Sequence, residues 1–274
     1  MKTICNPSQV IVRGFQFTWA CFVSFAEYFF RLLPRGESRD QAALARWCQR
    51  TARRFLDVLN VTYECTGRVP TGGVLACNHL SYLDILVLAA TAPMTFVSKY
   101  QVKHWPVFGW FAVLSRTLFL RRERKSHAVE LSQQFGRVVN EDVLLTLFPE
   151  GTSTDGRVVK PFHSTLFQPV VQNGWQATPA WLSYQMTDGS VEREVCYIDD
   201  MTFLPHFLNL LASDRIHARL VFGATAPAGL DRKELARYLH NQVCRIAAEH
   251  CGCERLSNPQ VEWEGMPMPA VNPG

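Results

Sequence analysis

From residue 61 onward, short runs of apolar residues alternate with longer stretches in which apolar positions recur at helical spacing. The short runs predict β-strands at 61–65, 73–77, 94–98, 117–121, 143–148, 177–184 and 219–224. The longer stretches predict helices at 83–91, 126–140 and 232–249, and Asp231 is a suitable N-cap for the last of them. Strands that alternate with helices indicate an α/β fold with a mixed, largely parallel sheet flanked by helices.

The first 33 residues follow another pattern, because residues 10–33 are apolar and rich in aromatic side chains. Polar residues interrupt this stretch at Arg13, Gln16, Glu27 and Arg31. The uncharged part, residues 14–26, is shorter than the roughly 20 residues that cross a bilayer as a simple helix. The pattern favours an interfacial or re-entrant helix, and a tilted span or an ordinary buried helix are the alternatives.

Residues 39–60 predict an amphipathic helix with one apolar face and one basic face. Arginines lie on the basic face at Arg46, Arg50, Arg53 and Arg54. We therefore expect membrane-associated helices over residues 1–60, a catalytic domain over 61–256 and a disordered tail over 257–274, where proline and glycine are frequent.

Composition narrows the possible partners. The net charge of +4 in 274 residues is too small to indicate a nucleic-acid-binding protein, so a membrane surface is the favoured anionic partner. The nine cysteines form no Cys-x-x-Cys pair, which predicts reduced thiols and a cytosolic active site. The eight histidines form no His-x3-His pair, so we expect no metal.

The candidate chemistry begins at His79, which follows a predicted strand and precedes a predicted helix. Asp84 comes five residues later, in the first turn of that helix. A carboxylate that meets one imidazole nitrogen fixes the tautomer and leaves the other nitrogen free to take a proton. Such a pair forms a general base without a protein nucleophile, although a structural role in capping the helix explains the same spacing.

Two further polar clusters also follow predicted strands. Glu150, Gly151 and Thr152 come after the strand at 143–148, and Arg121 and Arg122 end the strand at 117–121. Guanidinium pairs suit phosphate or carboxylate groups. In a parallel sheet the ends of neighbouring strands meet at one edge, so we expect the three clusters to converge.

Together these residues resemble the glycerolipid acyltransferases typified by 1-acylglycerol-3-phosphate acyltransferase. Asn78-His79 through Asp84 matches the His-x4-Asp motif of that family, and 118–122 resembles its second motif. Residues 148–152, Phe-Pro-Glu-Gly-Thr, match the third motif closely, and 178–180 resemble the fourth. The resemblance covers about residues 60–225, in the family's order and spacing.

The resemblance implies the following roles. His79 is the general base, Asp84 orients it, and the residues that bind the acceptor's phosphate or headgroup are Arg121, Arg122, Glu150, Gly151, Thr152 and Lys160. The donor is an acyl-carrier protein or coenzyme A thioester used as a co-substrate, with no further cofactor. The acceptor is the free hydroxyl of a membrane lysolipid, foremost 1-acylglycerol-3-phosphate. The expected location is the bacterial inner membrane, with the catalytic domain on the cytoplasmic side.

Two departures from the family pattern leave the acceptor open. In the second motif, Arg116 and Arg121 stand where a glycine and an acidic residue are common in the family. After the third motif, His163 stands where the family has a basic residue following Pro-Phe, so Lys160 is the alternative candidate for the nearby cation. The stretch 152–167 resembles bacterial relatives that acylate lyso-ornithine lipid, which is one alternative acceptor; another lysophospholipid is a second. Two other functions remain open: a thioester or lysolipid hydrolase, and a non-catalytic lipid-binding protein.

Overall fold

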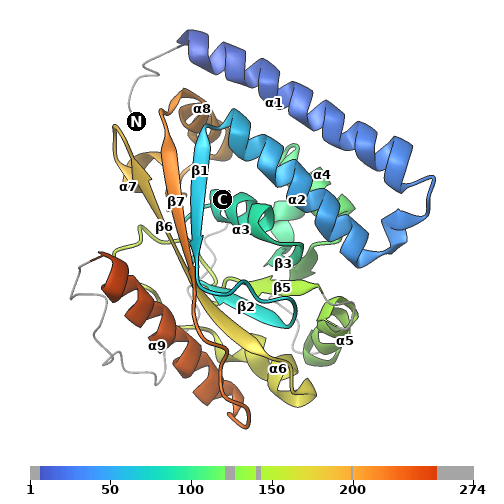
Figure 1. Ribbon diagram of the computed structural model, residues 1–274, viewed down its shortest axis with the longest axis vertical. Coiled ribbons are helices and arrows are strands. Elements are labelled where there is room, and N and C mark those ends of the chain that lie inside the picture. Colours follow the sequence, from blue (N-terminus) through green and yellow to red (C-terminus); the bar gives the residue numbers. More distant parts are fainter. Residues whose placement is uncertain (1–6, 121–126, 140–142, 199, 252–274) are drawn as a thin grey trace.

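The computed structural model describes residues 7–120, 127–139, 143–198 and 200–251. Two of the expected headgroup ligands, Arg121 and Arg122, lie outside the described residues, as does the expected disordered tail. Within the described residues the chain folds around one central sheet with helices on both of its faces (Figure 1).

The sheet has seven strands in the order β1-β7-β6-β2-β5-β3-β4. The strands are β1 (Val61–Thr66), β2 (Val74–Cys77), β3 (Met94–Lys99), β4 (Leu118–Leu120), β5 (Leu144–Leu147), β6 (Ala177–Met186) and β7 (Ile216–Phe222). Neighbours from β6 through β4 run parallel, β7 runs antiparallel to β6, and β1 pairs parallel with β7. The predicted α/β fold with a mixed, largely parallel sheet is confirmed.

Two hydrophobic cores cover the two faces of the sheet, because successive side chains of a strand point to opposite faces. In β2, Leu75 and Cys77 join the core on one face, and Val74 and Ala76 join the core on the other. All four are buried, as expected for a strand covered on both sides.

The helices divide between these faces. The first core is covered by α1 (Pro7–Glu27), α2 (Gln41–Val58), α3 (Leu83–Thr91), α4 (Phe108–Leu114) and α8 (Phe203–Ala212). The second is covered by α5 (His127–Val139), α6 (Gln168–Asn173) and α9 (Arg232–Cys251). Shorter elements are a π-helical turn (Tyr28–Leu32), α7 (Val191–Glu194) and 3₁₀ turns at Glu37–Arg39, Tyr100–His104 and Ser164–Phe167.

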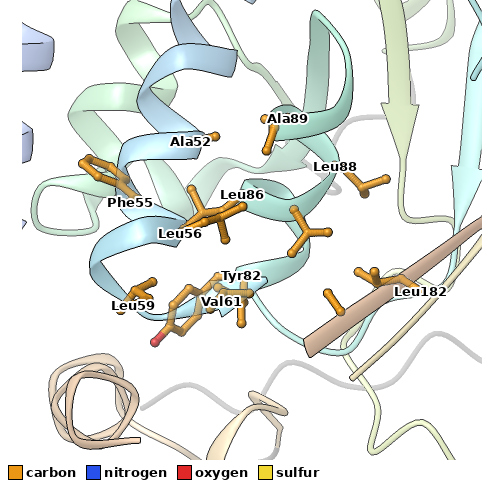
Figure 2. Packing of buried hydrophobic residues seen from close by; sticks show 14 of the residues in the cluster. Ala52, Phe55, Leu56, Leu59, Val61, Tyr82, Leu86, Leu88, Ala89 and Leu182 are labelled. Carbon is orange, nitrogen blue, oxygen red and sulfur yellow. The ribbon is translucent and has the colours of Figure 1, made fainter. Parts of the chain in front are cut away.

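The contact of α2 with α3 supports the end of α3 that follows the loop holding His79. Asp40 caps α2 by accepting a hydrogen bond from the backbone N–H of Ala42 at 2.8 Å. Figure 2 shows Ala52 and Leu56 on the apolar face of α2 directed at Leu86 and Ala89 of α3, whereas Phe55 lies on the side of α2 away from α3. Burial of this face anchors α3, whose first turn carries Asp84.

Charged residues that interrupt the apolar pattern of the first segment have partners within the fold. Arg13 donates to the backbone carbonyl of Leu211 at the end of α8, at 3.0 Å. Glu27 accepts hydrogen bonds from Arg50 at 2.7 Å and from Arg54 at 2.9 Å, so part of the basic face of α2 is paired with the first segment. None of the helices in the described ranges combines the length and apolar character that crossing a bilayer requires.

Four helices were not predicted from the sequence. Pro205 in the first turn of α8 hides its helical pattern, and α4, α6 and α7 are too short to show a clear helical pattern. Helix α4 overlaps residues 105–111, which are rich in aromatic side chains, and packs partly into the first core through Phe111.

Candidate active site

The site lies at the carboxyl ends of the parallel strands, because β2 and β5 are neighbours and their following loops leave the sheet at the same edge. His79 lies in the loop between β2 and α3. Glu150 lies in the loop after β5. The predicted convergence of these two clusters is therefore observed, whereas the arginine cluster lies outside the described residues.

The side chains of His79 and Asp84 form a hydrogen-bonded pair. The imidazole Nδ1 lies 2.8 Å from Asp84 Oδ2. Asp84 is fully buried, whereas about a fifth of the His79 side chain remains exposed. An Nδ1–H that donates to the carboxylate leaves Nε2 as the acceptor. The pair thus has the geometry of an oriented base that can take a proton from a bound molecule.

Asp84 receives further donors from its surroundings. The backbone N–H groups of Leu80 and Ser81 donate to Oδ2 at 2.7 and 3.0 Å. The hydroxyl of Tyr184 on β6 donates to Oδ1 at 2.7 Å. These donors compensate for the removal of the carboxylate from water. Tyr184 was not identified from the sequence, because it lies 100 residues from Asp84 along the chain.

Glu150 is a second buried carboxylate beside the first. Its Oε1 accepts from the backbone N–H of His79, and its Oε2 from the backbone N–H of Lys160, each at 2.7 Å. Burial raises the pKa of Glu150 to about 8, although the two backbone hydrogen bonds act in the opposite direction. The carboxylate is only 4% exposed, so in this geometry it ties two loops together.

Further contacts hold the loop around His79. The carboxamide of Asn78 accepts from the backbone N–H of Leu182 at 2.7 Å and donates to the carbonyl of the same residue at 2.9 Å. The carbonyl of His79 accepts from the N–H of Thr154 at 2.9 Å. The imidazole stacks on the ring of Phe148, with centroids 4.1 Å apart. The loop is therefore positioned from both of its sides.

An apolar cavity of about 640 Å³ opens beside His79. Its walls include Phe55 of α2 and Phe108 and Phe111 of α4, and Phe148 lines it beside the imidazole. Cavities of this size and character hold medium-sized apolar ligands. The arrangement places a base next to a space suited to a hydrocarbon chain.

The other expected binding residues occupy different places. Gly151 and Thr152 line the cavity, and Gly151 has φ +69°, a left-handed conformation that glycine adopts without steric cost. The Lys160 side chain is exposed and does not line the cavity, whereas His163 does. Lys99, at the end of β3, also lines the cavity and was not identified from the sequence. Its position at the end of a strand that pairs with β4 could have indicated it.

Arg116 occupies an unusual backbone conformation, with φ +55°. Glycine adopts this left-handed conformation without steric cost, whereas an arginine adopts it only at a steric cost. The glycine common at this position in the resembling family is thereby explained. The Arg116 guanidinium donates to the backbone carbonyl of Arg39 at 3.2 Å.

Two further kinds of site were considered within the part of the chain that the structure describes: a cysteine nucleophile and a metal centre. Burial holds the pKa of the Cys77 thiol well above its usual value, so this cysteine packs in the core as a neutral side chain. No group of three or more metal-ligating side chains comes together in the described ranges.

Comparison with known proteins identifies the family of this chain. A family model described as Acyltransferase matches residues 60–183. A lyso-ornithine lipid O-acyltransferase of Pseudomonas aeruginosa is 34% identical over 207 residues, which cover 74% of this chain and 78% of that relative. The chain belongs to the acyltransferase family.

Two further relatives support the same family and fold. A 1-acyl-sn-glycerol-3-phosphate acyltransferase of Neisseria meningitidis is 28% identical to this acyltransferase over 220 residues, 78% of this chain and 83% of that one. The crystal structure of a 1-acyl-sn-glycerophosphate acyltransferase of Thermotoga maritima has a TM-score of 0.61, covering 88% of this chain and 97% of that one at 15% identity. The acyltransferase thus shares the fold of that enzyme.

Proposed function

We propose that this acyltransferase moves a fatty acyl chain from an acyl-carrier protein or coenzyme A thioester to the free hydroxyl of a lysolipid. The observation that carries the proposal is the His79–Asp84 pair beside an apolar cavity of about 640 Å³. Direct transfer without a covalent enzyme intermediate needs a general base and a place for the acyl chain, and this pair and cavity supply both.

In the proposed reaction, Nε2 of His79 takes the proton of the acceptor hydroxyl. The hydroxyl oxygen then attacks the thioester carbonyl carbon, which forms a tetrahedral intermediate with a negatively charged oxygen. Collapse of that intermediate forms the ester and breaks the carbon–sulfur bond. The thiolate leaves and takes up the proton that His79 holds, so the base is regenerated. Asp84 stabilises the transient imidazolium.

We propose lyso-ornithine lipid as the first acceptor to test, with 1-acylglycerol-3-phosphate as the second. The relatives named for lyso-ornithine lipid from Pseudomonas aeruginosa and Brucella abortus are each 34% identical, compared with 28% for the Neisseria meningitidis enzyme. Both acceptors carry an anionic group, and the cavity wall includes Lys99 and His163. The Lys99 ammonium group and a ring N–H of His163 are donors that suit a carboxylate or a phosphate.

We also propose that the first segment rests on a bacterial inner membrane, with the catalytic domain on the cytoplasmic side. Large apolar side chains are exposed along α1 and the turn after it: Ile11, Val12, Phe15, Trp19, Phe22, Phe29, Phe30 and Leu33. Trp110 of α4 is 61% exposed and contacts Phe25 of α1. A continuous exposed apolar surface of this kind is typical of lipid contact.

The deciding experiment is an acyl-transfer assay with the purified full chain in detergent. Labelled acyl-carrier protein and coenzyme A thioesters are offered with lyso-ornithine lipid, 1-acylglycerol-3-phosphate and other lysophospholipids. We expect a diacylated product that His79→Ala abolishes and that His217→Ala retains, since His217 lies on β7 and contacts Thr62.

Two results would contradict the proposal. Release of free fatty acid without any acylated lipid would identify a hydrolase. Binding of lipid without turnover of either thioester would identify a lipid-binding protein. The acceptor that gives the highest kcat/KM identifies the headgroup.

A further inference from the structure

One carboxylate oxygen of Asp84 is held by a side chain from a distant strand. Oδ2 already accepts from His79 Nδ1 and from two backbone N–H groups of the same loop. Oδ1 accepts from the hydroxyl of Tyr184 at 2.7 Å. Within the described residues, Oδ1 thus accepts its hydrogen bond from the hydroxyl of Tyr184.

The hydroxyl of Tyr184 acts as a donor and stays protonated. The residue is 6% exposed, and burial together with the charge of Asp84 holds the pKa of Tyr184 well above its usual value. Because a carboxylate only accepts, the proton of this hydrogen bond belongs to the phenol. The bond is thus charge-assisted and short, as such bonds are.

The strand that carries Tyr184 also holds the other side of the catalytic loop. Pairing of β6 with β2 ends at Ala180 opposite Cys77, so β6 continues beyond the end of its neighbour. Leu182 binds the side chain of Asn78 there, just before His79. Tyr184, two residues further and on the same face as Leu182, binds Asp84.

We propose that Tyr184 is a positioning residue for acyl transfer: its hydroxyl fixes the rotation of the Asp84 carboxylate and thereby the orientation of the His79 imidazole. The inference rests on the proposed function of the pair. With Oδ1 held, Oδ2 stays directed at Nδ1. Without the phenol, the carboxylate can rotate, and Nε2 loses its fixed direction toward the acceptor hydroxyl.

The test begins with Tyr184→Phe, which keeps the ring and removes only the hydroxyl. We expect kcat to fall about tenfold, whereas KM for donor and acceptor changes less than about twofold. With one donor fewer, the carboxylate of Asp84 keeps more of its negative charge and stabilises the positive charge of the His79 imidazolium more strongly, although it no longer fixes the direction of the ring. The acid limb of the pH profile should therefore move upward by about half a pH unit.

Tyr63→Phe is the matched control, because the hydroxyl of Tyr63 donates to the carbonyl of Ala90 at 3.3 Å, at the far end of α3. It should leave kcat and the pH profile unchanged. Activity is expressed per folded protein, from circular dichroism at the assay temperature. Wild-type kcat and pH profile in Tyr184→Phe would overturn the proposal.

A double-mutant cycle tests whether Tyr184 acts through Asp84. In the Asp84→Asn background, Tyr184→Phe should reduce kcat by no more than about twofold further, because the oriented pair is already lost. A full additional tenfold loss would show a role independent of Asp84 and overturn the inference.

A measurement without substrate separates this inference from the proposed function. The downfield proton resonance of His79 Nδ1–H should be present in the wild-type protein, absent in His79→Ala and shifted in Tyr184→Phe, but unchanged in Tyr63→Phe. An unshifted resonance in Tyr184→Phe would overturn the positioning role. A shifted resonance in a protein that acylates no lysolipid would contradict the proposed function and leave the coupling of Tyr184 to His79 intact.

Discussion

Asp84 and Glu150 are two buried carboxylates in neighbouring loops at one edge of the sheet, and they make different contacts. Both accept backbone N–H groups. Asp84 also accepts from an imidazole that faces the cavity, whereas the donors assigned to Glu150 in the described residues are the backbone amides of His79 and Lys160. Two carboxyl groups of similar burial thus differ in their partners: one is paired with a side chain at the cavity, and the other joins two loops.

His79 separates the two roles, because its side chain contacts Asp84 and its backbone N–H contacts Glu150. His79→Ala removes the first contact and keeps the second. We expect kcat to fall by about 10³-fold or more, with little change in the thermal unfolding temperature. Initial rates and calorimetry on one preparation check this. Substantial transfer by a well-folded variant would refute the general-base mechanism.

Asp84→Asn tests the carboxylate that serves the imidazole. The asparagine amide favours the wrong tautomer of His79, so kcat should fall by about 10²-fold or more while substrate binding persists. Steady-state kinetics with both substrates varied will separate kcat from KM. A rise in KM with kcat unchanged would assign Asp84 to substrate binding.

Glu150 should control the pH dependence of stability more than the chemistry. Its pKa is raised from 4.5 to about 8 by burial, so between these values the native state binds more protons than the unfolded state. The contribution of Glu150 to the free energy of unfolding is therefore complete below about pH 4.5 and is lost as the pH rises through about 8. Urea unfolding of the wild type should show this decrease. The curve for Glu150→Gln should be flatter, and equal slopes would contradict the expectation.

Thr51 differs from both carboxyl residues, because it is a buried polar residue whose side-chain hydroxyl makes no hydrogen bond within the described residues. Its Oγ1 has no hydrogen-bond partner among the described residues, and the residue is 4% exposed in the cavity wall. Thr51→Val keeps the shape and removes the hydroxyl, so the free energy of unfolding should rise by about 1 kcal/mol. Chemical denaturation measures it, and destabilisation would show that the hydroxyl has a partner in solution.

Much of the fold follows from local pattern. The strand ending at Cys77 is a continuous apolar run, and the helix that begins at Leu83 follows it directly, so the loop holding His79 was predictable. Helix α8 was not, because its proline and its apolar residues on several sides resemble a loop or a core segment. Its place is decided by packing against α1.

The candidate site was predictable where its residues are close in sequence. His79 and Asp84 are five residues apart, and a turn into a helix brings them together. The partners of Glu150 and Asp84 were not predictable, because the backbone amide of Lys160 and the hydroxyl of Tyr184 reach them through the order of the strands. The position of the cavity was not predictable either, because its walls come from several elements.

The sequence by itself determined the alternation of strands and helices and the proximity of His79 and Asp84, because each depends on neighbours within a few residues. The tertiary structure decided which donors hold the two carboxylates and where the cavity lies. It also decided that Glu27 pairs with arginines of α2. Those contacts join positions tens of residues apart, and their energy depends on burial and geometry that only the packed sheet and helices create.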